Sequence, residues 1–168
     1  MKQEYEEFLV KKFPLLYAGY DGDATKTCMA RGFEVGDGWF NLIHGLSLAI
    51  QSHIDWANKQ ADDAIEWNAM VDAGEAPTWW GDRPDKPTKR KVPRRVKQVV
   101  VSQVKEKFGL LRFTAFRHDT TVGAFIRAAE HTSSVTCETC GAPGEIIRGV
   151  WISVLCPACE AKRNLERS

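Results

Sequence analysis

The sequence predicts an α+β protein in which a long helix packs on a small antiparallel sheet and a C-terminal four-cysteine module follows. Three observations support this prediction. Apolar residues recur at helical spacing over a long stretch near the middle of the chain. From Val96 the apolar period changes to two, which is typical of strands. Four cysteines then occur as two closely spaced pairs in the last third of the chain.

The composition is that of a globular protein, with 43% hydrophobic and 27% charged residues among 168. A formal net charge of +1 excludes a general polycation. The opening residues lack the apolar core of a signal peptide, and no apolar run approaches the ~20 residues of a membrane-spanning helix. We therefore expect a protein of the reducing cytoplasm with no membrane partner.

The residues before the sheet are expected to form a short helix, a loop and the longest helix of the chain. Apolar side chains at helical spacing indicate the short helix over residues 5–13, and residues 15–31 contain the glycines and Asp-Gly-Asp turn of a loop. Asp37 is a good N-cap for the longest helix, because its carboxylate can accept hydrogen bonds from first-turn amides. An apolar stripe over residues 42–65 continues this helix until Gly74 ends it.

The second half of the chain is expected to supply the sheet. Period-two patterning predicts strands over residues 99–105 and 110–116, joined as a β-hairpin. We predict an α+β domain over residues 1–134, with a basic proline-rich insertion at about residues 77–97. The four-cysteine module is predicted over residues 135–168.

The cysteine pattern C-x2-C-x15-C-x2-C is typical of a zinc site. Two tight turns would each contribute two thiolates, from Cys137 and Cys140 and from Cys156 and Cys159. Four thiolates fill the tetrahedral shell of Zn²⁺ and leave no position for water, which predicts structural rather than catalytic Zn²⁺. A helix over residues 160–167 would make the module treble-clef-like, and without that helix it would be a zinc ribbon.

The sequence favours a binding protein over an enzyme. It contains no phosphate-binding glycine loop, no nucleophile-elbow motif and no His-Glu-x-x-His motif, and its four histidines are scattered. We assign no catalytic residue. A constellation assembled from distant residues remains the alternative.

Cationic and aromatic residues of the α+β domain suit an anionic ligand that carries a ring. Lys105 and Arg112 are expected to lie near each other across the hairpin, where an Arg guanidinium can bind phosphate through two parallel hydrogen bonds. Arg31 and Lys107 lie in segments that could converge on the same region, and Trp39 is the predicted stacking partner for a base. The alternative is that these cations form the solvated face of a sheet and the aromatic residue belongs to the core.

The basic proline-rich segment supports a second hypothesis, nucleic-acid binding. Eight Lys or Arg and only two Asp occur between residues 82 and 97, so the segment would contact phosphates without reading sequence. Trp79 and Trp80 beside it suit stacking on single strands. The alternative is a solubilising loop that binds nothing specific. In either case we expect the segment to be mobile and dispensable for folding, because its prolines remove backbone donors and its like charges repel. The predicted phosphate contacts are Lys89, Arg90, Lys91, Arg94 and Arg95.

Four stretches carry a family resemblance: F-P-L-L-Y at residues 13–17, G-D-G-W-F at 36–40, V-S-Q-V-K-E-K-F-G-L-L-R-F at 101–113, and C-E-T-C-G with L-C-P-A-C near the end. Together they resemble a family of small phage and prophage accessory proteins of uncharacterised activity, over most of the chain except the basic insertion at 79–95. The resemblance implies viral origin and action inside a bacterial cell. Small phage proteins of this size act by sequestering nucleotide signals of host defence, blocking a host enzyme or holding nucleic acid. We therefore expect non-enzymatic capture of a phosphate-bearing, nucleotide-like ligand, with nucleic-acid binding and inhibition of a host protein as alternatives.

Overall fold

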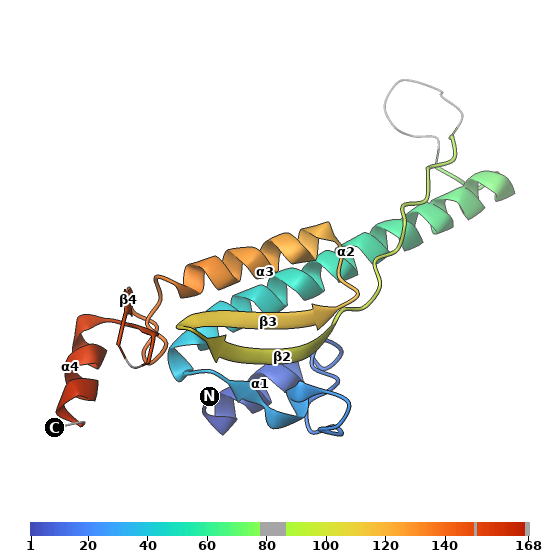
Figure 1. The fold of residues 1–168 in the computed structure, drawn as a ribbon. Helices are drawn as coiled ribbons and strands as arrows, with labels where there is room; N and C mark the ends of the chain where they lie inside the picture. Colours follow the sequence, from blue (N-terminus) through green and yellow to red (C-terminus); the bar gives the residue numbers. More distant parts are fainter. Residues whose placement is uncertain (78–86, 150, 167–168) are drawn as a thin grey trace. The chain divides into compact units, whose positions relative to one another are not determined.

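The structure, a computed structural model, describes residues 1–77, 87–149 and 151–166. The chain divides into two compact units, one combining Met1–Gln51 with Gln98–Ser168 and the other being Ser52–Lys97. The fold class is α+β as predicted, because helices pack with a small sheet and a four-cysteine cluster follows near the C-terminus (Figure 1). The predicted domain boundary before residue 135 stays a prediction.

The first unit begins with α1 (Gln3–Lys12), which packs on the start of α2 (Phe40–Ala73). The rings of Tyr5 and Phe40 stack with their centroids 4.4 Å apart. The first part of α2 passes behind the sheet in Figure 1, and its Ile43 is fully buried. Although α2 has 34 residues, no helix in the described part of the chain is both long and apolar enough to span a membrane.

The long helix does not begin where the sequence predicts. A 3-10 turn, η2 (Asp37–Trp39), precedes α2, and its N-cap residue is Gly36, which makes no side-chain hydrogen bond. The Asp37 carboxylate instead accepts a hydrogen bond from the backbone amide of Lys2 at 2.7 Å. The prediction that Asp37 caps the long helix is therefore wrong, and this carboxylate ties the N-terminal residues to η2.

The sheet of the first unit has three strands in the order β1-β2-β3. Strands β2 (Val100–Lys107) and β3 (Leu110–Phe116) pair antiparallel as predicted, whereas β1 (Phe33–Glu34) pairs parallel to β2. The sheet is therefore mixed, which corrects the prediction of a purely antiparallel sheet. A two-residue strand offers no alternation that a sequence pattern could detect.

A two-residue turn, Phe108 and Gly109, connects β2 to β3. The φ angles of these residues are +55° and +76°, and positive φ at both central positions is the requirement of a type I′ turn. A Cβ added to Gly109 would lie 3.1 Å from Cγ2 of Ile152 and 3.3 Å from Cα of Ser153. The hairpin tip therefore packs closely on the C-terminal module.

The outer edge of β3 is covered by α3 (Thr120–Ser133). Ser133 Oγ accepts a hydrogen bond from the Leu111 amide at 2.9 Å, and Glu130 Oε1 accepts one from the Phe113 amide at 3.2 Å. These two side chains satisfy backbone donors that an edge strand would otherwise expose to pairing with another chain.

The two faces of the β2–β3 hairpin differ in character. Val104, Leu111 and Phe113 are buried and face the core. Lys105 lies directly opposite Arg112, and this pair alternates with the buried residues along both strands. The cations therefore share the outer face, as the sequence predicts.

The C-terminal module contains a small hairpin and a helix. Its strands are β4 (Glu145–Ile147) and β5 (Ser153–Leu155), and they pair antiparallel. Helix α4 (Pro157–Leu165) begins directly after Cys156, which is its N-cap residue, and includes Cys159. Because the second cysteine pair lies at the start of a helix, the treble-clef-like arrangement fits the module better than the plain ribbon.

The second unit consists of the remainder of α2 and an extended segment over residues 87–97 that runs beside it (Figure 1). Asn58 donates to the carbonyl of Val96 at 3.1 Å and accepts from its amide at 3.0 Å. Asn68 makes the same pair of bonds with Arg90, at 2.9 and 2.7 Å. The described part of the basic segment is therefore hydrogen-bonded to the helix, and the prediction of a mobile loop is wrong for these residues.

Candidate metal centre

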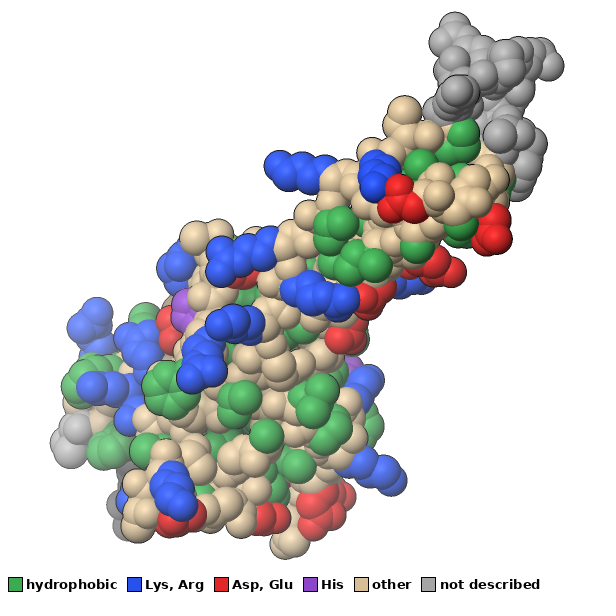
Figure 2. All heavy atoms as spheres, turned by 90° about the vertical axis from the view of Figure 1, so that its right-hand side faces the viewer, with side chains coloured by type: hydrophobic (Ala, Val, Ile, Leu, Met, Phe, Trp, Pro, Cys, Tyr) green, Lys and Arg blue, Asp and Glu red, His purple; other side chains and the backbone are tan. Residues whose placement is uncertain are grey.

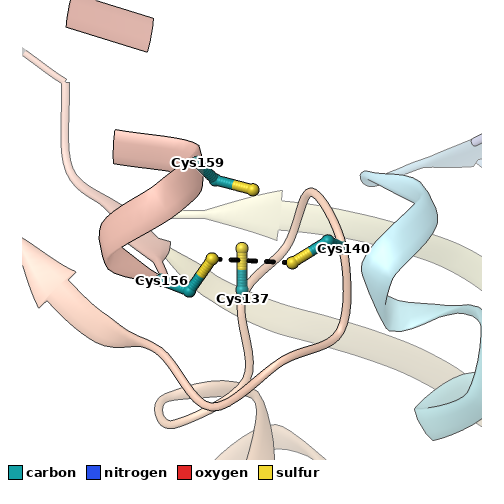
Figure 3. A group of neighbouring side chains, drawn as sticks. All are labelled: Cys137, Cys140, Cys156 and Cys159. Atoms are coloured by element: carbon teal, nitrogen blue, oxygen red, sulfur yellow. Dashed lines mark hydrogen bonds between the residues drawn. The ribbon is translucent and has the colours of Figure 1, made fainter. Parts of the chain in front are cut away.

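The four cysteines of the C-terminal module converge on one point (Figure 3). Their Sγ atoms all lie within 4.8 Å of one another, and those of Cys140 and Cys156 are 3.6 Å apart. A tetrahedral metal with bonds of ~2.3 Å separates its sulfur ligands by about 3.8 Å, which matches this spacing. The cluster could therefore hold a metal ion through Cys137, Cys140, Cys156 and Cys159.

Two tight turns position the thiols. In the first, the Gly141 amide donates to the Cys137 carbonyl at 2.8 Å, and the Cys137 amide donates to the Ala142 carbonyl at 2.8 Å. Gly141 has φ of +80°, a left-handed value that glycine adopts without a Cβ clash. In the second turn, Pro157 is the first residue of α4, where its fixed φ suits the start of a helix. Cys156 is the N-cap residue and Cys159 lies in the first turn of α4.

The electrostatics of the thiols favour a cation at their centre. Burial raises the pKa of the Cys137 thiol, but hydrogen bonds from the backbone of Cys156, Cys140 and Thr139 more than offset this and lower it to about 7. Burial and the neighbouring thiols raise the pKa of Cys159 to about 12. Four thiolates at this spacing repel one another strongly, so a soft divalent metal is the cation that allows them all to ionise.

The first cysteine turn docks on the Gly-Asp-Gly-Trp stretch that precedes α2. The Gly38 amide donates to the Glu138 carbonyl at 2.8 Å, and the Gly36 amide donates to Glu138 Oε1 at 2.9 Å. A Cβ on Gly38 would lie 2.3 Å from the Cys137 carbonyl oxygen and 2.4 Å from the Gly141 amide nitrogen. Only glycine allows the two backbones to approach this closely, which explains why the stretch is rich in glycine.

Trp39 belongs to this docking contact and not to a ligand site. Its side chain is fully buried, and Nε1 donates to the Thr136 carbonyl at 2.8 Å. A buried indole presents no face to a base, so the prediction that Trp39 stacks on a ligand is wrong. Its large apolar ring instead anchors the module to the rest of the first unit.

The predicted ligand cations lie on different parts of the first unit. Arg112 is 40% exposed and its Nη1 is 3.7 Å from Glu130, whereas the Lys105 side chain has no hydrogen bond or ion pair within the described residues. Lys107 lies two positions further along β2, with Nζ 5.4 Å from the Phe108 ring centre. The exposed Arg31 ends η1 (Cys28–Arg31), and no contact joins its side chain to the other three cations.

Several predicted nucleic-acid contacts in the second unit are engaged by acidic residues of α2. Lys89 Nζ lies 2.7 Å from the carboxylate of Asp72, and Arg95 pairs with Asp62. Figure 2 shows red and blue side chains close together over the part of the surface nearest the grey atoms. The positive charge of the segment is therefore partly neutralised within its own unit.

Of the remaining predicted nucleic-acid contacts, Arg90 makes a side-chain contact within the second unit, whereas Lys91 and Arg94 make none among the described residues. The Arg90 guanidinium lies over the Trp67 ring at 4.2 Å, a cation–π contact. Lys91 and Arg94 are exposed, with no side-chain hydrogen bond or ion pair among the described residues. Outside the described residues lie Trp79 and Trp80.

Sequence reasoning missed two hollows that meet at Trp151. One is a groove of about 430 Å³ between Trp151 and the tip of the β2–β3 hairpin at Phe108. The other is a hollow of about 330 Å³ beside the cysteine cluster, and Lys162 and Arg163 line it. Arg163 donates to Ser153 at 2.5 Å, while its buried Nε has no partner. The walls of each hollow come from segments that are distant in the sequence, and the local signal is limited to the bulky residue before Gly109 in the hairpin turn.

The fold and the cysteine cluster define an α+β protein with a four-cysteine module that suits a metal ion. Comparison of the chain with protein-family models, curated proteins and solved structures finds no match. The resemblance to phage accessory proteins therefore stays a hypothesis.

Proposed function

We propose that the four cysteines bind one structural zinc ion, and that the chain is a non-enzymatic protein that captures a phosphate-bearing, nucleotide-like ligand. Zinc is the metal that four thiolates in a tetrahedral cluster suit best, and complete coordination leaves no site for a reacting water. The sulfur spacing supports this proposal. Bound zinc would join the two cysteine turns and so hold the module in one shape.

The role of the metal follows from what the module contacts. Its first turn meets Gly36 and Gly38, and its β5 strand meets Gly109 at the hairpin tip. Among its described residues the module has a small buried cluster of its own, formed by Cys137, Leu155 and Cys156. Zinc would supply the stability that so small a core lacks.

The capture of a ligand is supported by one observation, the pairing of Lys105 with Arg112 on the outer face of the hairpin. Two cations held on adjacent strands lose little conformational freedom when they bind a phosphate. We place this capture in the cytoplasm of a phage-infected bacterium, where it would remove a nucleotide signal of host defence.

Two measurements test the capture. Mass spectrometry of small molecules released on denaturing protein purified from infected cells should detect a phosphate-bearing compound. Arg112→Ala should weaken binding of that compound about tenfold or more, because a charged hydrogen bond contributes roughly 1.5–3 kcal/mol. The variant should keep its melting temperature, since a partly exposed ion pair contributes little. Unchanged affinity in this variant would contradict the proposed site.

Nucleic-acid binding is the second candidate, and the free cations Lys91 and Arg94 favour it. Binding to a polyanion falls steeply with salt, whereas a nucleotide pocket loses much less affinity. Arg94→Ala should weaken binding and reduce the salt slope if this candidate is correct. If Arg94→Ala has no effect and Arg112→Ala does, the nucleotide proposal stands.

A further inference from the structure

Two exposed aromatic residues face the groove at the hairpin tip. The Phe108 side chain is 68% exposed and that of Trp151 is 64% exposed. Together with Lys107 and Ile152 they line a space of about 430 Å³, within the size range of small-molecule sites. Large apolar side chains that gather around an open groove indicate a binding surface.

Phe108 is a poor choice for its position if folding alone is considered. The first residue of a type I′ turn needs positive φ, and Asn, Asp or Gly adopt it readily. A bulky side chain at φ +55° costs roughly 1–2 kcal/mol. Because most of the ring is exposed, burial does not offset this cost. Neither turn geometry nor burial therefore explains a phenylalanine at residue 108.

Three cations, Lys107, Lys105 and Arg112, lie in a row that begins at the groove. Lys107 lines the groove, and Lys105 lies two residues back on the same face of β2, about 7 Å away by the rise of a strand. Arg112 stands opposite Lys105. Glu106, which also lines the groove, accepts a hydrogen bond from the Gly109 amide. Neither lysine has an ion pair within the described residues, although Glu34 of β1 lies opposite Lys105. Arg112 is partly exposed and paired with Glu130, and an incoming phosphate would compete with that carboxylate.

We propose that the groove holds the base of a nucleotide with two or more phosphates, stacked against Phe108 and Trp151. The phosphates would meet first Lys107 and then Lys105 with Arg112. Stacking on aromatic rings contributes roughly 1–3 kcal/mol per base, and the cations complement the phosphate charge. The inference rests on the proposed capture function and supplies the base-binding part that Trp39 cannot provide.

Phe108→Asn is the sharpest test, because stability and binding should change in opposite directions. The Asn-Gly turn suits type I′ geometry, so the melting temperature should rise. Loss of the ring should weaken binding of a nucleoside diphosphate by about tenfold. A lower melting temperature would show that the ring serves the fold and would overturn the argument.

Matched variants separate the groove from the rest of the surface. Trp151→Ala should weaken binding about tenfold. Trp56→Ala should leave it unchanged, although the Trp56 side chain on α2 is also 64% exposed. Lys107→Ala should weaken binding, whereas Lys162→Ala, which removes the same charge from the hollow beyond Trp151, should not. The opposite result for the two lysines would overturn the assignment.

Calorimetric titration with four kinds of probe completes the test. The ribonucleoside 5′-diphosphates should bind, while adenosine and pyrophosphate should each bind at least tenfold more weakly, because each lacks half of the contacts. Stronger binding of a ten-nucleotide oligothymidylate would overturn the proposal in favour of single-stranded nucleic acid. If diphosphates bind and Arg112→Ala matters but both aromatic variants bind normally, only this inference fails. If no diphosphate binds, both it and the capture function fail.

Discussion

The C-terminal module and the second unit are held together by different means. Neither has a large apolar core among the described residues. The buried cluster of the module consists of Cys137, Leu155 and Cys156, and the extended segment of the second unit lies along one helix. The module brings four thiols to a single point, whereas Asn58 and Asn68 bind the extended segment at two places far apart along α2.

The two regions show two ways in which a segment that lacks an apolar core can be held in one conformation. A structural zinc contributes roughly 10–16 kcal/mol at neutral pH, concentrated in one bond network. A hydrogen bond contributes only about 1 kcal/mol net, and a surface ion pair roughly 0–1 kcal/mol. Loss of the metal should therefore unfold the whole module. Loss of one Asn side-chain amide should lower the stability of the second unit only slightly.

The largest effect is expected for Cys156→Ser. Replacing one thiolate leaves the proposed zinc site incomplete, so metal binding and the fold of residues 137–165 should be lost together. Hydrogen exchange should show unprotected amides in the module, while those at Val96 and Arg90 stay protected. Cys28→Ser is the control, because Cys28 is exposed and outside the cluster. Normal zinc content in Cys156→Ser would contradict the ligand assignment.

A smaller but still large effect is expected for Gly38→Ala. The new Cβ would clash with the backbone of Cys137 and Gly141, so the module should separate from the η2 turn while the proposed zinc site stays intact. Thermal unfolding should show a loss of several kcal/mol, because backbone atoms cannot shift easily. Gly45→Ala is the control: nothing lies within 4 Å of its added Cβ, and a helical Gly→Ala change should stabilise by about 0.5–1 kcal/mol. Equal melting temperatures for the two variants would disprove the docking contact.

The smallest effect is expected in the second unit. Asn58→Ala and Asn68→Ala each remove two hydrogen bonds to the extended segment, at about 1 kcal/mol per bond. Hydrogen exchange at the Val96 and Arg90 amides should speed up roughly tenfold or more, without loss of zinc. Asn41→Ala, at an exposed position of α2, should change neither amide. Unchanged exchange rates in both variants would show that residues 87–97 are not held on α2 by these hydrogen bonds.

The parts of the fold that could be predicted depend on local patterns. The cysteine spacing predicts the cluster, and the apolar periods predict α1, α2 and the β2–β3 hairpin. Contacts between distant segments could not be predicted: β1 is too short to show a period, and Trp39 looks like a stacking residue until its place beneath Thr136 is known. The groove at Phe108 had one local signal, a bulky residue before glycine in a hairpin turn.

The central claim is that Cys137, Cys140, Cys156 and Cys159 bind one structural zinc ion, and X-ray absorption at the zinc edge tests it most directly. Fresh protein that has never met a chelator should contain one zinc per chain, with four sulfur neighbours at ~2.3 Å and no oxygen or nitrogen in the first shell. Substantially less than one zinc per chain, or a shell that includes a light-atom ligand, would contradict the claim.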